Sequence, residues 1–410
     1  MGETARIGVI VPEFPGQTHT FFWREMQAMD RLGVDLSLIS TRRPAARLVS
    51  HDWAGEAIAR TTYLAPLGPG PLAASLPAAA LALRDGIGAR AIAAERAWFL
   101  RSAALHVPFA RHLNRLARAR GFGHVHVHSC GRSALIAMLA RRMGGPSYSL
   151  TLHGPLCDYG PGQRYKWRDA AFATVVTETL KREVERTVAG IGLPPILVQP
   201  MGVDTDRFRR DAPYVPADPK APVRIFSCGR LNRVKGHDHL IRAVGRLAQQ
   251  GVDARLEIAG EDDAGGTGYR KTLETQIAEE GLGDRVTLLG AIGQGALRDR
   301  LLAAHLFVLA SRREALGVAY MEAMACELPV VGTNAGGVPE LIDHGRNGVL
   351  VPPEDVDALV AAISGLLADP DRARAMGRAG RRTVVDRFAA ARSAQTLVDA
   401  IAAHGAPPPR

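Results

Sequence analysis

Two glutamates, Glu314 and Glu322, lie eight positions apart in a mostly apolar stretch that runs from Arg313 to Ala325. If one continuous helix carried both, they would be separated by about 80° around its axis and about 12 Å along it. At that separation the two carboxylates do not form a pair that acts on one atom. The spacing alone leaves open why a mostly apolar segment carries two carboxylates.

Two cations follow the strand-like run VRIFSCG. Arg230 and Lys235 lie just past its end and are flanked by Gly229 and Gly236, which allow the backbone to approach a ligand closely. Two fixed cations in this position suit a diphosphate, because arginine offers a planar fork and lysine a point charge. Alone this is a weak signal, since arginine and lysine are common on protein surfaces.

The run LFVLASRREALG predicts a strand that enters a loop, and a helix that begins near Leu316, Gly317 and Val318. Glu314 would then lie in the loop, and Glu322 about one turn inside the helix. The first backbone N–H groups of a helix have no partner within it, so they favour an anion or a hydroxyl group as a ligand.

Further along the chain, the strand-like run PVVGT is followed by a second glycine turn, Asn334 to Gly337, before another expected helix. The combined segments would present two cations, two polar helix starts and two carboxylates to one cleft. This combination fits a sugar nucleotide, with the cations on the phosphates and the carboxylates on the hydroxyl groups of the ribose and the sugar.

The elements that must position these residues alternate along the whole chain. Short β-rich runs are separated by roughly 10–20 residues of helical periodicity, which predicts βαβ units and parallel sheets. A stretch with four prolines, 211–222, is expected to link two doubly wound domains, 1–212 and 213–387, and a helix at 388–405 is expected to join the first. The expected strands are RIGVIV, VDLSLIS, HVHVH, YSLTL, TVV, ILVQP, VRIFSCG, RLEIAG, RVTLLG, LFVLAS and PVVGT.

Composition limits the possible classes. A chain of 410 residues with 47% apolar and 22% charged residues is globular and too long for one ordinary domain. The scattered cysteines, the absence of a signal peptide and the lack of a membrane-spanning run indicate a cytoplasmic protein.

Dinucleotide-binding, P-loop, zinc-protease and serine-hydrolase motifs are absent. Asp355 and Asp369 precede apparent helices, where capping is a better interpretation than metal binding.

The net charge of +10 is unevenly distributed. Segment 84–120 holds eight arginines against Asp85 and Glu95, and in FARHLNRLARAR Arg111, Arg115 and Arg118 share the face opposite the apolar side chains. Such a helix suits an anionic membrane surface or an anionic acceptor, although an ordinary solvated face is equally compatible. Nucleic acid is disfavoured, because aromatic residues are only 5% and no binding motif accompanies the charge.

Several motifs together resemble those of the retaining family-four glycosyltransferases. The residues concerned are the E-x7-E pair with AMACELPVVGTNAGGVPELI, the diphosphate-binding element GRLNRVKG, QPMGVDTDRF and the histidine motif TLHG. The resemblance spans nearly the whole chain. It implies the α/β GT-B fold, in which two facing Rossmann-like domains with parallel sheets border an interdomain cleft. The first domain would bind the acceptor and the second the nucleotide sugar.

The resemblance also implies roles for individual residues. Glu314 would bind the donor sugar and stabilise oxocarbenium-like charge, and Glu322 would bind the ribose. Arg230 and Lys235 would neutralise the leaving diphosphate, so that neither a metal nor a cofactor is needed. His153 of TLHG would reach the sugar from the facing domain.

Two regions depart from the family pattern. The loop VPEFPGQTHTFF lacks the usual pair of glycines, which leaves Gly16 and Gln17 as candidates for contact with the diphosphate or the acceptor. Leu316 stands where phenylalanine is usual and would alter the shape of the pocket. Glu327 stands where glycine is usual and is expected at a helix end, where it should be harmless.

The implied function is retaining, metal-independent transfer of a sugar from a nucleoside-diphosphate sugar to a glycan or lipid-linked glycan in cell-surface polysaccharide assembly. Peripheral association with the inner face of the membrane would suit such an acceptor. The alternatives are a sugar-nucleotide epimerase of the same fold and a noncatalytic sugar-nucleotide-binding subunit.

Two weaker expectations concern residues outside these motifs. The histidines of HVHVH are expected to pack or to reach a cleft edge rather than to bind metal, and Cys157 and Asp158 are candidates to line the acceptor side.

Overall fold

The computed structural model describes residues 6–16, 19–44, 51–65, 96–218, 220–263 and 265–405, without the side chains of 96–101. Contacts divide them into two compact units. Unit 1 contains the described residues of Met1–Pro44, Gly55–Pro200 and Ser393–Arg410, and unit 2 contains those of Ala45–Ala54 and Met201–Arg392. The expected junction at 212/213 lies inside unit 2, and most of the C-terminal helix lies in unit 1.

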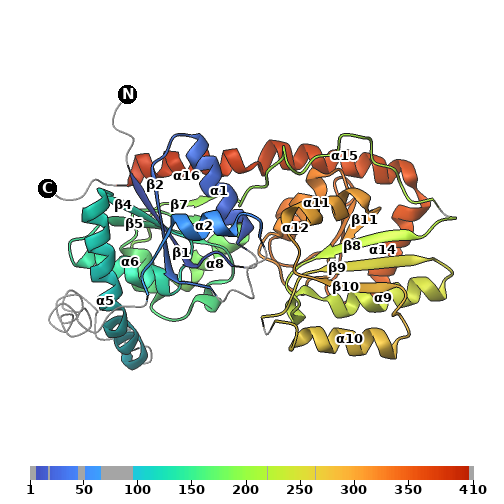
Figure 1. The fold of residues 1–410 in the computed structure, drawn as a ribbon, viewed down its shortest axis with the longest axis horizontal. Helices are drawn as coiled ribbons and strands as arrows, with labels where there is room; N and C mark the ends of the chain where they lie inside the picture. Colours follow the sequence, from blue (N-terminus) through green and yellow to red (C-terminus); the bar gives the residue numbers. More distant parts are fainter. Residues whose placement is uncertain are drawn as a thin grey trace. The chain divides into compact units, whose positions relative to one another are not determined.

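Unit 1 is built on a parallel sheet with the strand order β3-β2-β1-β4-β5-β6-β7. Helices cover both of its faces, with α1 and α16 on one and α5 and α6 on the other (Figure 1). The strands are β1 (Ile7–Glu13), β2 (Leu36–Arg42), β3 (Thr61–Tyr63), β4 (His124–Val127), β5 (Ser147–Leu152), β6 (Ala173–Val175) and β7 (Ile196–Val198). The helices are α1 (Thr20–Arg31), α2 (Ala54–Arg60), α5 (Arg96–Arg120), α6 (Arg132–Arg142), η2 (Leu156–Tyr159), α7 (Gln163–Arg168), α8 (Glu178–Thr187) and α16 (Ala390–His404).

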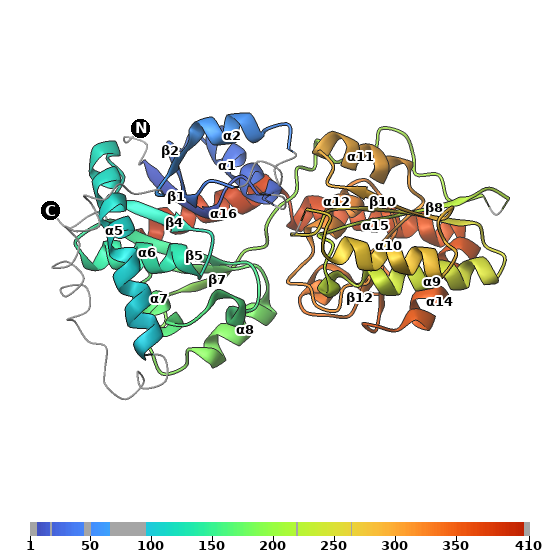
Figure 2. The same cartoon turned by 60° about the horizontal axis from the view of Figure 1, so that its bottom comes forward.

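Unit 2 has a second parallel sheet, in the order β10-β9-β8-β11-β12-β13, with helices on both faces (Figure 2). The strands are β8 (Val223–Cys228), β9 (Ala254–Ala259), β10 (Val286–Gly290), β11 (Leu306–Val308), β12 (Val330–Thr333) and β13 (Val349–Val351). The helices are η3 (Arg233–Lys235), α9 (His237–Gln249), α10 (Tyr269–Glu279), α11 (Gln294–Ala303), α12 (Val318–Ala325), α13 (Val338–Leu341), α14 (Val356–Ala368) and α15 (Pro370–Arg387).

Alternation along the central strands of unit 2 explains how both faces of its sheet are buried. Ile225 and Val308 belong to the core that also holds apolar side chains of α9 and α14. Their neighbours Phe226 and Phe307 are buried too, and Phe307 packs edge-on against Tyr320 of α12. Successive side chains of a strand point to opposite faces, so strands covered on both sides read as continuous apolar runs. The alternation of apolar strand-like runs with helix-like segments in the sequence thus predicted the parallel α/β sheets correctly.

Two helix starts confirm the capping interpretation. The carboxylate of Asp355 accepts a hydrogen bond from the backbone N–H of Ala358, and that of Asp369 accepts one from Arg372, both at 2.9 Å. Each therefore satisfies one of the unpaired N–H groups at the start of α14 or α15. The short strands β3 and β13 were not among the expected elements.

Glu327 lies just past the end of α12, as expected, but its backbone is left-handed, with φ of +56°. This conformation costs a residue with a side chain about 1–2 kcal/mol, which explains why glycine is usual at the position. The carbonyl of Glu327 also receives a close backbone contact from α15. A Cβ atom at Gly377 would lie 2.1 Å from this oxygen.

Two helical glycines should respond in opposite ways to alanine. Gly377→Ala should lower the free energy of unfolding by about 1–3 kcal/mol, because α15 must move away from the loop after α12. Gly365→Ala on α14, where an added Cβ meets nothing within 4 Å, should raise it by about 0.5–1 kcal/mol. Urea unfolding of the two variants checks both signs, and a neutral Gly377→Ala would contradict the tight packing.

Candidate active site

The centre of the candidate site in unit 2 is an ion pair between two predicted residues. The ammonium of Lys235, at the end of η3, lies 2.5 Å from Oε2 of Glu314 in the loop after β11. Their side chains are only 20% and 12% exposed. Two opposite charges that lie this close and are largely shielded from water attract one another more strongly than an ordinary surface pair does.

Glycines bring the surrounding loops together. Gly236, with φ of +65°, packs so closely that a Cβ there would lie 1.9 Å from the carbonyl oxygen of Ala310. Gly336, with φ of +61°, packs equally closely, since a Cβ there would lie 2.0 Å from the carbonyl oxygen of Glu314. The N–H of Gly337 donates to that same oxygen at 2.9 Å. The loops after β8, β11 and β12 therefore touch backbone to backbone, and Gly236 and Gly336, which the sequence analysis expected to approach a ligand, permit this contact.

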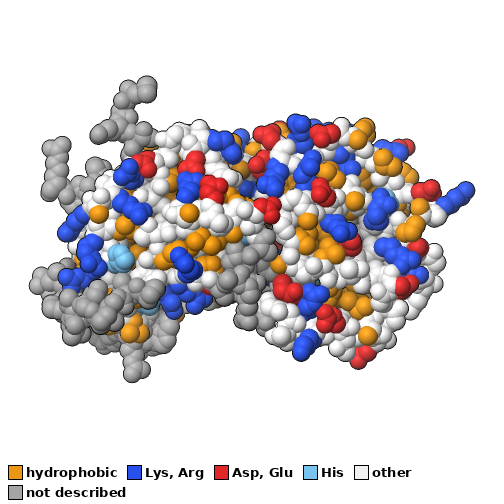
Figure 3. Space-filling model, in the orientation of Figure 1, with side chains coloured by type: hydrophobic (Ala, Val, Ile, Leu, Met, Phe, Trp, Pro, Cys, Tyr) orange, Lys and Arg blue, Asp and Glu red, His pale blue; other side chains and the backbone are white. Residues whose placement is uncertain are grey.

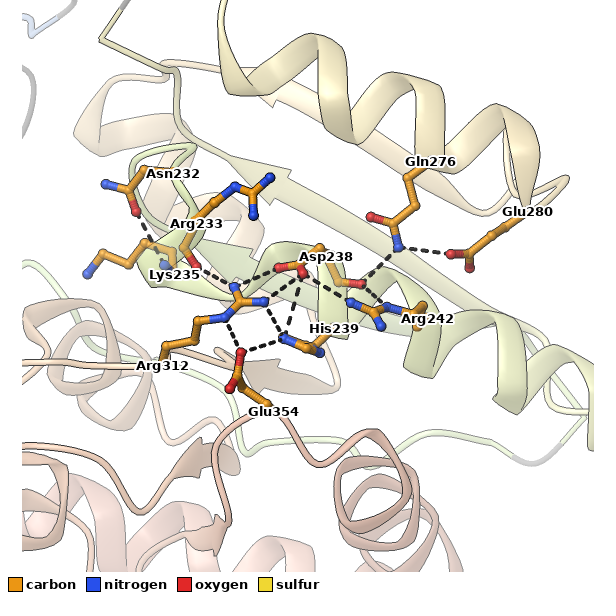
Figure 4. A network of polar contacts seen from close by, with 10 residues as sticks. All are labelled: Asn232, Arg233, Lys235, Asp238, His239, Arg242, Gln276, Glu280, Arg312 and Glu354. Atoms are coloured by element: carbon orange, nitrogen blue, oxygen red, sulfur yellow. Dashed lines mark hydrogen bonds and ion pairs between the residues drawn. The ribbon is translucent and has the colours of Figure 1, made fainter.

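A polar network around Arg312 fixes the two loops that carry the ion pair (Figure 4). The guanidinium makes two hydrogen bonds to the carboxylate of Asp238, at 3.0 and 2.8 Å, and one to Glu354 at 2.5 Å. The guanidinium also donates to the backbone carbonyl of Arg233. The backbone N–H of Arg312 donates to the backbone carbonyl of Val234 at 2.8 Å. Arg312 thus ties the loop after β11 to the turn that presents Lys235.

The charges of this network perturb one another. Partial burial alone would raise the pKa of Asp238, but the hydrogen bond from Arg312 and the nearby His239 and Arg242 lower it to about 2. The hydrogen bond that Arg312 donates to Asp238 leads the contacts that raise the pKa of Arg312. Glu354 has a left-handed backbone, with φ of +64°, at the point where its side chain reaches Arg312. Sequence reasoning missed this network, since nothing in the sequence separates Arg312 and Asp238 from ordinary surface charges.

Helix α12 begins at Val318, as predicted, and Gly317 is its N-cap, with no side chain capping this end. Glu322 lies inside the helix and is 6% exposed, and Leu316 is 4% exposed. The charges of Glu322 and Lys235 both influence the thiol of Cys228. Burial, together with the charge of Glu322 and against that of Lys235, raises the pKa of Cys228 to about 12.

Arg230 is not part of the Lys235–Glu314 pair. Its side chain is 44% exposed and lies 3.7 Å from Oδ2 of Asp263, which is itself 77% exposed. Such an exposed, long contact contributes little to stability. The guanidinium of Arg230 can therefore change partners at small cost.

The predicted residues of unit 1 follow its strands. His153 lies just past β5, and its Nε2 is 3.3 Å from Nδ1 of His128. Burial lowers the pKa of each to about 3, so both imidazoles are neutral near pH 7. Gly16 accepts a hydrogen bond from the N–H of His19 and packs beneath the ring of that histidine. Gln17 lies outside the described residues.

The remaining histidines of β4 pack as predicted. His124 and His126 are buried, and their ring nitrogens lie 2.8 Å from the hydroxyl groups of Ser147, Ser149 and Thr151. Cys157 and Asp158 are exposed and contact one another at 3.6 Å.

The arginine stripe of α5 has the orientation that its periodicity predicts. Leu113 is buried, whereas Arg111, Arg115 and Arg118 are exposed. Lys and Arg side chains gather over the visible part of α5 (Figure 3). Residues 84–95 of the basic segment lie outside the described residues. Among the described helices, none combines the length and the apolar character of a membrane span.

The stability of unit 2 should depend on pH through Asp238. A carboxylate whose pKa falls from 3.8 to about 2 on folding stabilises the fold above pH 4, and this contribution disappears as the pH falls to 2. Asp238→Asn should therefore lower the free energy of unfolding by about 1–2 kcal/mol at pH 7, allowing for solvent screening, and by less at pH 2–3. Urea unfolding between pH 2 and pH 7 measures the difference. Asp386→Asn, at an exposed position, is the control. A loss of unfolding free energy in Asp238→Asn that stays constant from pH 7 to pH 2 would contradict the lowered pKa of Asp238.

Comparison with known proteins places the chain in a family. Residues 19–207 match the family described as Glycosyltransferase Family 4, and residues 210–383 match Glycosyl transferases group 1. The chain is 34% identical to a GDP-mannose-dependent alpha-(1-6)-phosphatidylinositol monomannoside mannosyltransferase of Mycolicibacterium smegmatis, over 62% of this chain and 70% of the relative.

A second relative, from Corynebacterium glutamicum, is a GDP-mannose-dependent monoacylated alpha-(1-6)-phosphatidylinositol monomannoside mannosyltransferase. It is 30% identical over 69% of this chain and 77% of the relative. The solved sucrose-phosphate synthase of Thermosynechococcus elongatus shares the fold, with a TM-score of 0.73, 21% identity and coverage of 96% of this chain and 98% of that one. With these similarities and its two parallel α/β sheets, the chain belongs to the family 4 glycosyltransferases of the GT-B fold class, and it is a glycosyltransferase.

Proposed function

We propose that the protein transfers a hexose from a nucleoside-diphosphate sugar to a glycosylated lipid, with retention of anomeric configuration and without a metal ion. The observation that carries the proposal is the ion pair of Lys235 and Glu314, which joins a cation at a strand end to a carboxylate in the next loop. The names of the two mannosyltransferase relatives support GDP-mannose as the first donor to test and a phosphatidylinositol mannoside as the first acceptor.

The proposed chemistry uses the charges of unit 2. Lys235 and Arg230 bind the diphosphate and stabilise the negative charge that develops as the bond to the sugar breaks. As the ammonium of Lys235 turns toward phosphate, Glu314 is free to bind sugar hydroxyl groups and to stabilise oxocarbenium-like charge. Glu322 accepts hydrogen bonds from the ribose, and the uncapped start of α12, from Leu316 to Val318, provides backbone donors. No protein nucleophile is assigned, which is consistent with a front-face mechanism.

In unit 1, we assign His153 to a substrate hydroxyl group, as the family resemblance implies. A neutral imidazole suits this task, because it can donate or accept one hydrogen bond without attracting an anion. Gly16 is assigned to the diphosphate or the acceptor with less support, since it packs against His19. Gln17 keeps the same assignment from its sequence position alone.

The catalytic assignment is tested by removing either member of the ion pair. Lys235→Ala and Glu314→Ala should each lower kcat for mannosyl transfer from GDP-mannose by about 100–1,000-fold, because each removes charge that stabilises the transition state. Radiolabelled transfer to phosphatidylinositol mannoside, resolved by thin-layer chromatography, measures the rate. Full activity in either variant would overturn the assignment.

Matched controls and a binding measurement complete this test. Lys271→Ala and Glu279→Ala, on the exposed side of α10, make the same chemical changes and should leave transfer unchanged. Thermal shift with GDP-, UDP- and ADP-sugars identifies the donor, since a bound ligand raises the apparent stability. A wild-type protein that converts the sugar nucleotide without an acceptor would favour the epimerase alternative, and one that binds without any turnover would favour a noncatalytic subunit.

The exposed arginines of α5 support an acceptor that lies at an anionic membrane surface. Replacing Arg111, Arg115 and Arg118 together by glutamine should weaken binding to phosphatidylinositol-containing vesicles by about 100-fold, at about 1 kcal/mol for each charge. Vesicle co-sedimentation measures this. The control replaces three exposed arginines of α15, Arg372, Arg378 and Arg382, and should bind as the wild type does. Binding that is independent of anionic lipid would remove the surface proposal.

A further inference from the structure

A chain of three titratable groups runs through unit 1, from two buried side chains to the partly exposed His153. Glu25 of α1 and His128, which follows β4, are each 2% exposed. Oε2 of Glu25 lies 3.1 Å from Nε2 of His128, and Nδ1 of His128 lies 3.3 Å from Nε2 of His153. The contact is not aligned as a hydrogen bond, and neither Oε2 nor Nε2 of His128 has a hydrogen-bond partner among the described residues. A buried polar atom without a partner is costly, which favours a proton shared between these two atoms.

The opposite side of the Glu25 carboxylate is held by two donors. Oε1 accepts hydrogen bonds from the hydroxyl group of Ser393 at 3.0 Å and from the amide of Gln199 at 3.3 Å. The same amide is fixed by the backbone carbonyl of Ser393 at 2.8 Å. Burial raises the pKa of Glu25, whereas the charge of His126 and the hydrogen bond from Ser393 oppose the rise. With both donors on Oε1, Oε2 is the oxygen that faces His128, and in an ionised Glu25 it would accept a proton from that histidine.

The proton positions along the chain then follow from the chemistry of imidazole. A neutral imidazole carries one N–H and one acceptor nitrogen. If Nε2 of His128 donates to Glu25, its Nδ1 must be the acceptor. That acceptor requires the proton of His153 to lie on Nε2, which leaves Nδ1 of His153 without a proton.

We infer that Glu25, acting through His128, fixes the tautomer of His153 so that its Nδ1 accepts a hydrogen bond from a substrate hydroxyl group. Glu25 and His128 are positioning residues, since neither touches the substrate. The link to the substrate rests on the proposed function, whereas the proton pattern rests on the three side chains alone. A glutamine at position 25 would reverse the pattern, because its amide N–H would donate to Nε2 of His128.

The test measures tautomers and turnover separately. In the full chain labelled with ¹⁵N-histidine, two-bond proton–nitrogen correlation spectra report which nitrogen of each neutral ring carries the proton, and His153→Gln assigns the signal. The wild type should show His153 protonated at Nε2, and Glu25→Gln should show it protonated at Nδ1. Glu25→Gln should also lower kcat/KM for transfer by about 10–100-fold, the effect of losing one hydrogen bond to a substrate hydroxyl group.

Each outcome decides one part of the inference. Glu56→Gln, the same change at a 59% exposed position of unit 1, should leave the tautomer of His153 as it is. A wild-type His153 protonated at Nδ1 overturns the relay even if Glu25→Gln fails to fold, and an unchanged tautomer in that variant does the same. A reversed tautomer with unchanged turnover overturns the contact with substrate. A wild type that transfers no sugar counts against the proposed function, while the spectra still decide the relay.

Discussion

The candidate site of unit 2 depends on backbone contacts that only glycine permits. Gly236 and Gly336 adopt left-handed conformations against the carbonyl oxygens of Ala310 and Glu314, so the loops after three neighbouring strands meet without intervening side chains. Parallel strands bring their carboxyl ends to one edge of a sheet, and these contacts then fix the loops to one another. The short distance between Lys235 and Glu314 is a consequence of that arrangement, since both charges are carried by loops that cannot separate.

The charges divide into those that are held and those that can change partners. Arg312 is saturated by Asp238, Glu354 and a backbone carbonyl, so a ligand would have to replace several strong hydrogen bonds to recruit it. Among the described residues, the contact of Arg230 with an acid is the long, exposed one with Asp263. Lys235 lies between these cases, because its carboxylate partner, Glu314, is itself a proposed ligand contact. An anion entering the site would therefore meet Arg230 and Lys235 as its available cations, while Arg312 maintains the loops.

The sequence identified most of these parts but not their contacts. The apolar runs predicted both sheets. The glycines at 229, 236, 336 and 337 were expected to let the backbone approach a ligand, whereas in the structure Gly236 and Gly336 let the loops approach one another. The pairing of Lys235 with Glu314 was not predicted, because the two are distant in sequence and were assigned to different parts of one ligand. Arg312 and Asp238 carry no signal that separates them from exposed charges. Strands β3 and β13, of three residues each, are too short for periodicity to reveal. Glu327 was expected at a helix end, which is confirmed, but its left-handed backbone was not predicted.

The two units place different chemistry at the carboxyl ends of similar sheets. In unit 2 the groups are charged and partly exposed, which suits a diphosphate whose own charge offsets their desolvation. In unit 1 the strand ends carry neutral histidines, because burial lowers the pKa of His128 and His153 to about 3. A buried neutral imidazole cannot compensate an anion, but it can distinguish a hydroxyl group by the direction of one hydrogen bond. That direction is set by which nitrogen holds the proton, so a single buried carboxylate such as Glu25 can determine it without carrying charge to the ligand.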